Sequence, residues 1–101
     1  MAINVILQSI HGDRRDEVVD FDYCLARVWP SGDPSFPLLQ YIDPYGNTVF
    51  NGLQMPEVQK ELKRLIAMAS NDDQRKTLQR ICELAAKCQE RPQTFLRFRG
   101  D

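Results

Sequence analysis

The hydrophobic pattern of the chain changes its period at Pro56, and this change constrains the fold more than any other feature of the sequence. Before Pro56, apolar residues tend to alternate with polar ones, which is typical of β-strands. After it, Val58, Leu62 and Leu65 recur at the spacing of one helix face. A chain of 101 residues has the length of one domain. We therefore predict a single α+β domain over residues 1–101, with most strands preceding the helices.

Four segments of the first half are predicted to be strands that follow one another as an antiparallel meander. Residues 2–10 carry apolar side chains on both faces, which indicates a central strand. Residues 17–29 alternate most regularly and are rich in β-branched and aromatic residues. The third strand is residues 36–43, where Pro37 favours an edge position, and the fourth is residues 47–51.

The run Asp43-Pro44-Tyr45-Gly46 predicts a tight turn between the third and fourth strands. Aspartate is favoured at the first position of a type I turn, and proline supplies the φ angle that the second position needs. We expect Gly46 to take a left-handed conformation at the bulge that follows.

The second half predicts two helices and one returning strand. Residues 56–69 and 73–90 each carry an apolar stripe, and Asn71 between them can cap the second helix, with Gln74 completing a capping box. So short a connection makes the helices an antiparallel hairpin packed on one face of the sheet. Residues 93–99 then return as a fifth strand, either antiparallel to the fourth strand or parallel beside the first.

Composition excludes several classes of protein. The formal net charge is −1, which gives no general attraction to nucleic acid or to a membrane surface. Three cysteines, Cys24, Cys82 and Cys88, form neither a disulfide framework nor a zinc-ligand spacing. The N-terminal residues lack the basic region of a signal peptide, and no stretch is long and apolar enough to span a membrane. We therefore expect a cytoplasmic protein that binds no metal, cofactor or membrane.

The sequence holds no catalytic, metal-binding or nucleotide-binding motif, so we infer the class of function by elimination. What remains is an acidic first half, with seven acidic and three basic residues among residues 1–55, and aromatic residues that could project. The exposed aromatic candidates are Tyr41, Tyr45, Phe50 and Trp29. Tyr45 is the best of them because side chains in tight turns project outward and aromatic residues often anchor interfaces. The predicted partner-binding residues are Tyr45, Asp43, Asp20, Asp22, Asp13, Asp16 and Glu17.

Two other functions stay open. Asp20 and Asp22 share a strand face, so together with the single histidine, His11, they could form a small-ligand or catalytic site. The final strand carries Arg97 and Arg99 beside aromatic residues, a weaker indication of nucleic-acid binding. An open edge at the fourth or last strand would also allow two copies to pair as a homodimer.

The run Tyr41-Ile-Asp-Pro-Tyr-Gly-Asn-Thr-Val-Phe-Asn51, followed by Gly-Leu-Gln-Met-Pro and by the ending Phe-Leu-Arg-Phe-Arg-Gly-Asp, resembles a segment of small uncharacterised bacterial proteins. This resemblance implies no activity and no site residues. In size, in acidity at one end and in lacking catalytic groups, the chain is also similar to immunity proteins that neutralise bacterial toxins. We therefore predict a non-enzymatic protein-binding module, of the immunity type, that occludes a toxin or an enzyme.

Overall fold

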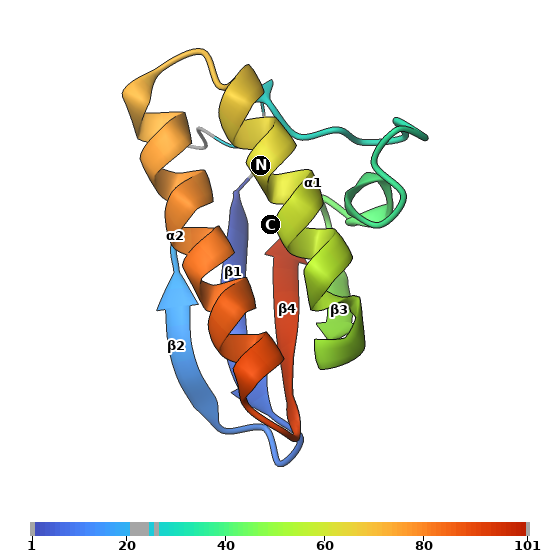
Figure 1. Ribbon diagram of the computed structural model, residues 1–101, viewed down its shortest axis with the longest axis vertical. Coiled ribbons are helices and arrows are strands. Elements are labelled where there is room, and N and C mark those ends of the chain that lie inside the picture. The colour runs from blue at the N-terminus through green and yellow to red at the C-terminus, as the bar shows by residue number, and fades with distance from the viewer. Residues whose placement is uncertain (1, 21–24, 26, 101) are drawn as a thin grey trace.

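The computed structural model describes residues 2–20, 25 and 27–100, and it confirms the predicted α+β class with two helices on one face of an antiparallel sheet (Figure 1). Both helices lie where the apolar stripes predict them. The elements in chain order are β1 (Ile3–Ser9), β2 (Arg14–Val18), the 3-10 turn η2 (Leu39–Tyr41), β3 (Asn47–Asn51), the 3-10 turn η3 (Gly52–Gln54), α1 (Met55–Met68), α2 (Asp72–Glu90) and β4 (Thr94–Gly100).

The sheet has the strand order β2-β1-β4-β3, and every neighbouring pair is antiparallel. β1 is therefore central, as its two apolar faces predict. β4 runs antiparallel to β3, which confirms one of the two predicted arrangements, and it also runs antiparallel to β1, so the parallel alternative is wrong. The predicted four-stranded meander is wrong as well, because β1 and β4 separate β2 from β3.

The predicted strand over residues 17–29 is wrong for most of its described length. The strand is β2, and it begins at Arg14, three residues before the predicted start. The ladder ends after Val18 because the Asp20 carboxylate accepts the Ile3 N–H (3.0 Å) that a longer β2 would have bonded. Leu25 lies in a helical turn and is buried, while residues 21–24 and 26 lie outside the described residues.

The predicted strand over residues 36–43 is also wrong, since this segment folds into successive turns that include η2. Its buried apolar residues, Phe36, Leu39 and Ile42, are spaced by three rather than two. Pro37 supplies no N–H for a ladder, and the Glu61 carboxylate of α1 accepts the Leu39 N–H at 2.9 Å. The segment is thus held by a side chain instead of a neighbouring strand.

Local sequence explains where the helices begin. A capping box, in which Asn51 and Gln54 bond each other's backbone, starts the 3-10 turn η3, which leads directly into α1. Pro56 occupies the first turn of α1. Asn71 caps α2 as predicted, accepting the Gln74 N–H at 2.9 Å. The Gln74 side chain bonds the Ser70 N–H rather than that of Asn71, so the second half of the predicted box is displaced by one residue.

The two faces of the sheet differ. The helix-facing side and the helices enclose the core. Residues 27–42 close one end of it, where Trp29 packs on Phe98 at 5.9 Å between ring centroids. Residues opposite one another in the register share a face, so Glu17, Ile6, Arg97 and Val49 form a row across the other side, which we call the open face. Ile6 is buried there but lies outside the core cluster.

Within the described residues, no helix combines the length and the apolar character needed to cross a membrane.

Candidate protein-interaction surface

Most of the large apolar side chains that the described residues leave exposed gather around one strand. Six are exposed, and four of these fall within the thirteen positions from 41 to 53, which contain β3. Tyr45 and Leu53 are the most exposed, at 80% and 92% of their surface. This concentration of exposed apolar groups on one stretch of the chain makes that stretch the candidate interaction surface. The four are Tyr41, Tyr45, Val49 and Leu53.

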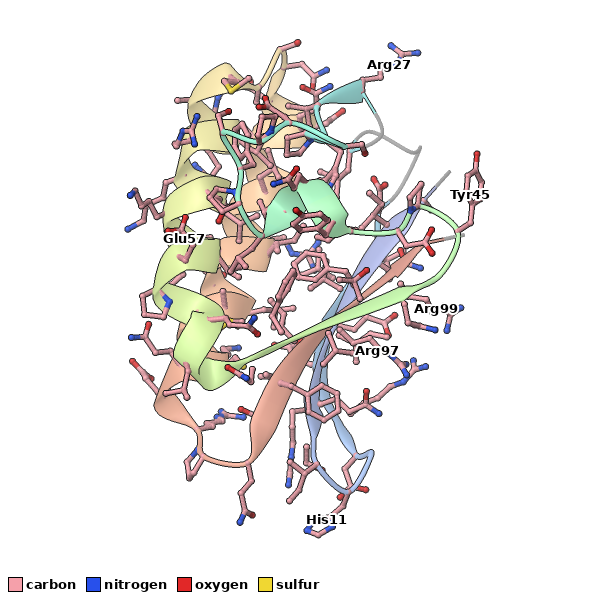
Figure 2. All side chains as sticks on the ribbon, turned by 90° about the vertical axis from the view of Figure 1, so that its right-hand side faces the viewer. His11, Arg27, Tyr45, Glu57, Arg97 and Arg99 are labelled. Atoms are coloured by element: carbon pink, nitrogen blue, oxygen red, sulfur yellow. The ribbon has the colours of Figure 1, made fainter. Side chains whose placement is uncertain are left out.

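The Asp43–Gly46 turn projects Tyr45 away from the sheet (Figure 2). The Asp43 carboxylate accepts the Tyr45 N–H at 2.8 Å and so holds the turn from inside. Gly46 does not have the positive φ that we predicted. A Cβ atom at this position would lie 2.6 Å from Oδ2 of Asp43, so any other residue would displace that carboxylate. Asp43 therefore shapes the turn that presents Tyr45.

Leu53 is exposed because the capping box ends β3 abruptly. Asn51 Oδ1 accepts the N–H groups of Leu53 (3.0 Å) and Gln54 (3.2 Å), and Gln54 Oε1 accepts the Asn51 N–H (2.9 Å). These bonds form η3, which turns the chain into α1 and leaves the Leu53 side chain outside the core.

The outer edge of β3 has unpaired backbone groups. Gly100 donates its N–H to the carbonyl of Gly46 at 2.7 Å, so Gly46 and Gly100 form a hydrogen-bonded pair. In antiparallel strands, every second pair of opposite residues is hydrogen-bonded. Thr48 and Phe50 are therefore the β3 residues whose backbone groups bond β4. The remaining residues of β3 direct their backbone groups away from the sheet, where no described strand pairs with them. They are Asn47, Val49 and Asn51, and of these Asn51 has its N–H bonded by Gln54 Oε1.

A cavity of about 610 Å³ lies at the far end of this edge. Leu53 and Pro56 line it from the β3 side, and Phe95 and Ile10 line it from the sheet. Its only charged lining residue among those described is Arg91. A hollow of this size with apolar walls can accept a large apolar side chain.

The opposite edge of the sheet, β2, holds several of the predicted acidic residues in internal contacts. The Glu17 N–H bonds Oδ1 of Asp16 at 2.8 Å, and Oδ2 of Asp16 pairs with Lys87 at 2.9 Å. The hydrogen bond from Lys87 lowers the pKa of Asp16. Glu17 pairs with Arg14 at 2.9 Å. Asp13 is exposed in the turn before β2.

The structure does not bring the predicted site residues into one patch. Asp16 lies opposite Leu7 and faces the helices, whereas Glu17 lies opposite Ile6 on the open face. Asp20 is 4% exposed and binds the backbone of Ile3 and Leu25, so it stabilises the fold. Asp43 and Tyr45 lie beside the last residue of β4, and Asp22 lies outside the described residues.

The alternative site of Asp20, Asp22 and His11 is not assembled by the described residues. His11 lies at the tip beyond β1, at the far end of the molecule from Tyr45 (Figure 2). Asp20 bonds the first residue of β1, so the seven-residue strand, roughly 20 Å long, separates it from His11. Within the described residues there is also no group of three or more histidine, cysteine or acidic side chains placed to hold a metal ion.

The C-terminal arginines project from the open face (Figure 2). Arg97 lies opposite Val49, and Arg99 lies opposite Asn47. Neither is in an ion pair with another described residue. Phe98 is buried in the core, so it cannot stack on a base, and Phe95 is half-buried. Nucleic-acid binding through this strand stays a prediction.

Several features of the surface were missed or misplaced by sequence reasoning. Phe50 and Trp29, predicted as exposed aromatics, are 5% and 8% exposed and belong to the core. Leu53 was missed, although a leucine between the two members of an Asn-x-x-Gln capping box lies outside any helical stripe. Glu61, which is fully buried and whose pKa is raised by that burial, gave no signal because it falls among other charged residues of α1.

Comparison of the chain with protein-family models, with curated proteins and with solved structures finds no match in any of the three.

Proposed function

We propose that this chain is a non-enzymatic protein-binding module that accepts an extended strand of a partner protein at the outer edge of β3. The observation that carries the proposal is the unpaired backbone of Asn47 and Val49 on a strand flanked by exposed Tyr45 and Leu53. Addition of a strand to an open sheet edge is a common mode of peptide recognition, in which backbone hydrogen bonds supply affinity.

The energies involved are sufficient for specific binding. Each backbone hydrogen bond contributes about 0.5–1.5 kcal/mol net, and burial of a large apolar side chain such as Leu53 contributes about 1.5–3 kcal/mol. Several of each are needed to exceed the roughly 4–15 kcal/mol cost of association. The edge offers both kinds of contact, and the cavity beside Leu53 adds a site that selects for one apolar side chain of the partner.

Within this class, we propose an immunity-type inhibitor that occludes a toxin or another enzyme. The small size, the acidic first half and the projecting Tyr45 support this form of binding protein. Acidic inhibitors gain fast association with basic targets through electrostatic steering.

The binding surface can be tested by photo-crosslinking in the source cell. A photoreactive residue replaces Leu53 in one variant and Lys76, an exposed residue of α2, in a matched control. We expect Leu53 to crosslink to a protein and Lys76 not to. Adding Val49→Pro should abolish the crosslink, because proline removes an outward N–H without touching the bonds to β4. A crosslink that persists in Val49→Pro, or the absence of any crosslink at Leu53, contradicts the proposal.

The inhibitor class has its own test. If a crosslinked partner is an enzyme, its activity should fall on adding the wild-type chain and be unaffected by Val49→Pro. A captured enzyme that both proteins leave fully active contradicts the inhibitor class, while the binding surface itself still stands.

A further inference from the structure

We propose that in the isolated protein the added strand comes from a second copy of the chain, paired antiparallel to β3 about a two-fold axis through Val49. The inference rests on the proposed use of this edge for strand addition, and it names the occupant. It joins two four-stranded sheets into one continuous sheet across the edge on the right of Figure 1.

The backbone selects this register. Only alternate residues of β3 direct their N–H and C=O groups outward, and these residues have to face one another for hydrogen bonds to form. An axis through Val49 places Val49 opposite itself and Asn47 opposite Asn51 of the second copy. The Asn51 N–H is already bonded by Gln54 Oε1, so each Asn47–Asn51 pair forms through the Asn47 N–H and the Asn51 carbonyl. Every other antiparallel register leaves at least one outward residue of each copy unpaired within the strand.

The exposed apolar residues on either side of β3 are placed symmetrically about Val49. Tyr45 precedes Val49 by four positions, and Leu53 follows it by four. Antiparallel pairing about Val49 therefore brings Tyr45 of each copy to the level of Leu53 of the other. These are the two most exposed large apolar residues among those described. The same two-fold rotation thus places Tyr45 against Leu53 at each end of the interface, as expected of a self-complementary two-fold contact.

Charge also favours a second copy. Residues 44–56 contain no charged side chain, although 27% of the whole chain is charged. A two-fold axis brings each residue near its own counterpart, so a charged strand would repel itself. Within the strand, Asn47 meets Asn51, Thr48 meets Phe50 and Val49 meets Val49, and none of these pairs opposes like charges.

The oligomeric state is the first measurement. Sedimentation velocity of the purified protein should show a species of twice the mass of one chain. Val49→Pro and Val49→Lys should each raise the dimer dissociation constant by at least about tenfold. The lysine variant keeps every backbone N–H and places a charge on a half-exposed residue of the open face, so it tests the dimer even if the proline variant unfolds. Circular dichroism melting establishes which variants are folded.

Cysteine crosslinking tests the register. Val49→Cys should form a disulfide-linked dimer on mild oxidation, because residues in a hydrogen-bonded pair have Cα atoms about 5.5 Å apart. With a short bifunctional maleimide, Tyr45→Cys and Leu53→Cys should not crosslink separately, and a mixture of the two should. The wild-type protein, with its native cysteines, is the background control.

The results decide the inference in either direction. A dimer with this crosslinking pattern supports it. A protein that stays monomeric at every concentration, or a dimer that Val49→Lys leaves intact, overturns it. If the protein is monomeric, a crosslink from Leu53 to a different protein in the cell still supports the proposed function. If Leu53 forms no crosslink at all, both the homodimer and the proposed function are contradicted.

Discussion

The two outer strands of the sheet, β2 and β3, differ in how their free edges meet solvent. Four of the five residues of β2 are charged, whereas β3 has no charged residue. The ladder of β2 also contains a register shift, and the outward Glu17 N–H is bonded by Asp16. Charges, irregularities and capped N–H groups are the usual protection of an exposed edge. The edge of β3 lacks all three along Asn47–Val49, which is why we assign binding to it.

The largest expected difference in stability is between two kinds of β3 residue. The inner residues direct their N–H groups toward β4, and the outer residues direct theirs toward solvent. Thr48→Pro removes an N–H that bonds β4 and also the hydroxyl that accepts the Asp43 N–H (3.0 Å). We expect it to lower the free energy of unfolding by about 2–4 kcal/mol. Val49→Pro should cost less than about 1 kcal/mol, because its N–H points outward. Urea denaturation of both variants measures the difference, and equal losses would refute the assignment of inner and outer residues.

The next effect concerns the turns around η2, which lie between β2 and β3 in the chain. Glu61→Ala leaves the buried N–H of Leu39 and the half-buried N–H of Leu38 without their acceptor, at a cost of about 1–3 kcal/mol. The substitution should also loosen η2 and with it the approach to β3, whereas β2 should be unaffected. Hydrogen exchange of the two strands checks this contrast, and equal deprotection of both would contradict it.

Glu61 also predicts a pH dependence. Burial raises the pKa of its carboxyl above the ordinary value, so the folded protein binds a proton that the unfolded chain has already released. Its contribution to stability is therefore largest below the ordinary glutamate pKa and is lost as the pH rises through the raised value. Melting temperatures measured over this range should fall in the wild type relative to Glu61→Gln. A constant difference between the two proteins would contradict the raised pKa.

A smaller effect is expected when the protected edge is opened. Asp16→Ala removes both the bond to the Glu17 N–H and the pairing with Lys87. The Asp16 side chain is 45% exposed, so we expect a loss of no more than about 1 kcal/mol, reduced further by salt. Because the pKa of Asp16 is lowered, this contribution is present at neutral pH and is lost as the pH falls. Urea denaturation at two salt concentrations measures it, with Asp13→Ala, an exposed aspartate, as the control.

The smallest expected change in stability is at Tyr45. Tyr45→Ala should alter the free energy of unfolding by less than about 0.5 kcal/mol, because the side chain is 80% exposed. The same variant should weaken binding at β3, since Tyr45 is one end of the proposed interface. Met68→Ala, which removes an exposed apolar side chain at the end of α1, away from this surface, is the matched control. Equal dissociation constants for the two variants would argue against the register centred on Val49.

The parts of the fold that follow from local pattern were predictable from the sequence. Both helices, the central first strand, the Asp43–Gly46 turn and the Asn71 cap depend on residues close together in the chain. The wrong strands were decided by distant residues. Alternation through residues 17–29 gives no indication that Asp20 will end β2 by bonding Ile3, and nothing near Leu39 shows that Glu61 will hold it in a turn.

The candidate surface was predictable only in part, for a similar reason. The exposure of Tyr45 follows from its place in a tight turn. The open edge of β3 depends on strand order, which puts β4 on one side and solvent on the other. No local pattern contains that information. The exposure of Leu53 was predictable from the sequence, because the Asn51–Gln54 capping box is a local motif that turns the chain at the intervening leucine.

The position of β4 between β1 and β3 has a consequence for the protein during its synthesis. β4 is the last of the described strands to leave the ribosome, yet it is the only one that pairs with β3. Until it emerges, β3 is an uncharged segment with two unpaired sides instead of one, and β1 has only β2 beside it. The nascent chain is thus most prone to aggregate late in translation, when the helices are complete and the sheet is not. A chain truncated before Thr94 would be held permanently at that stage.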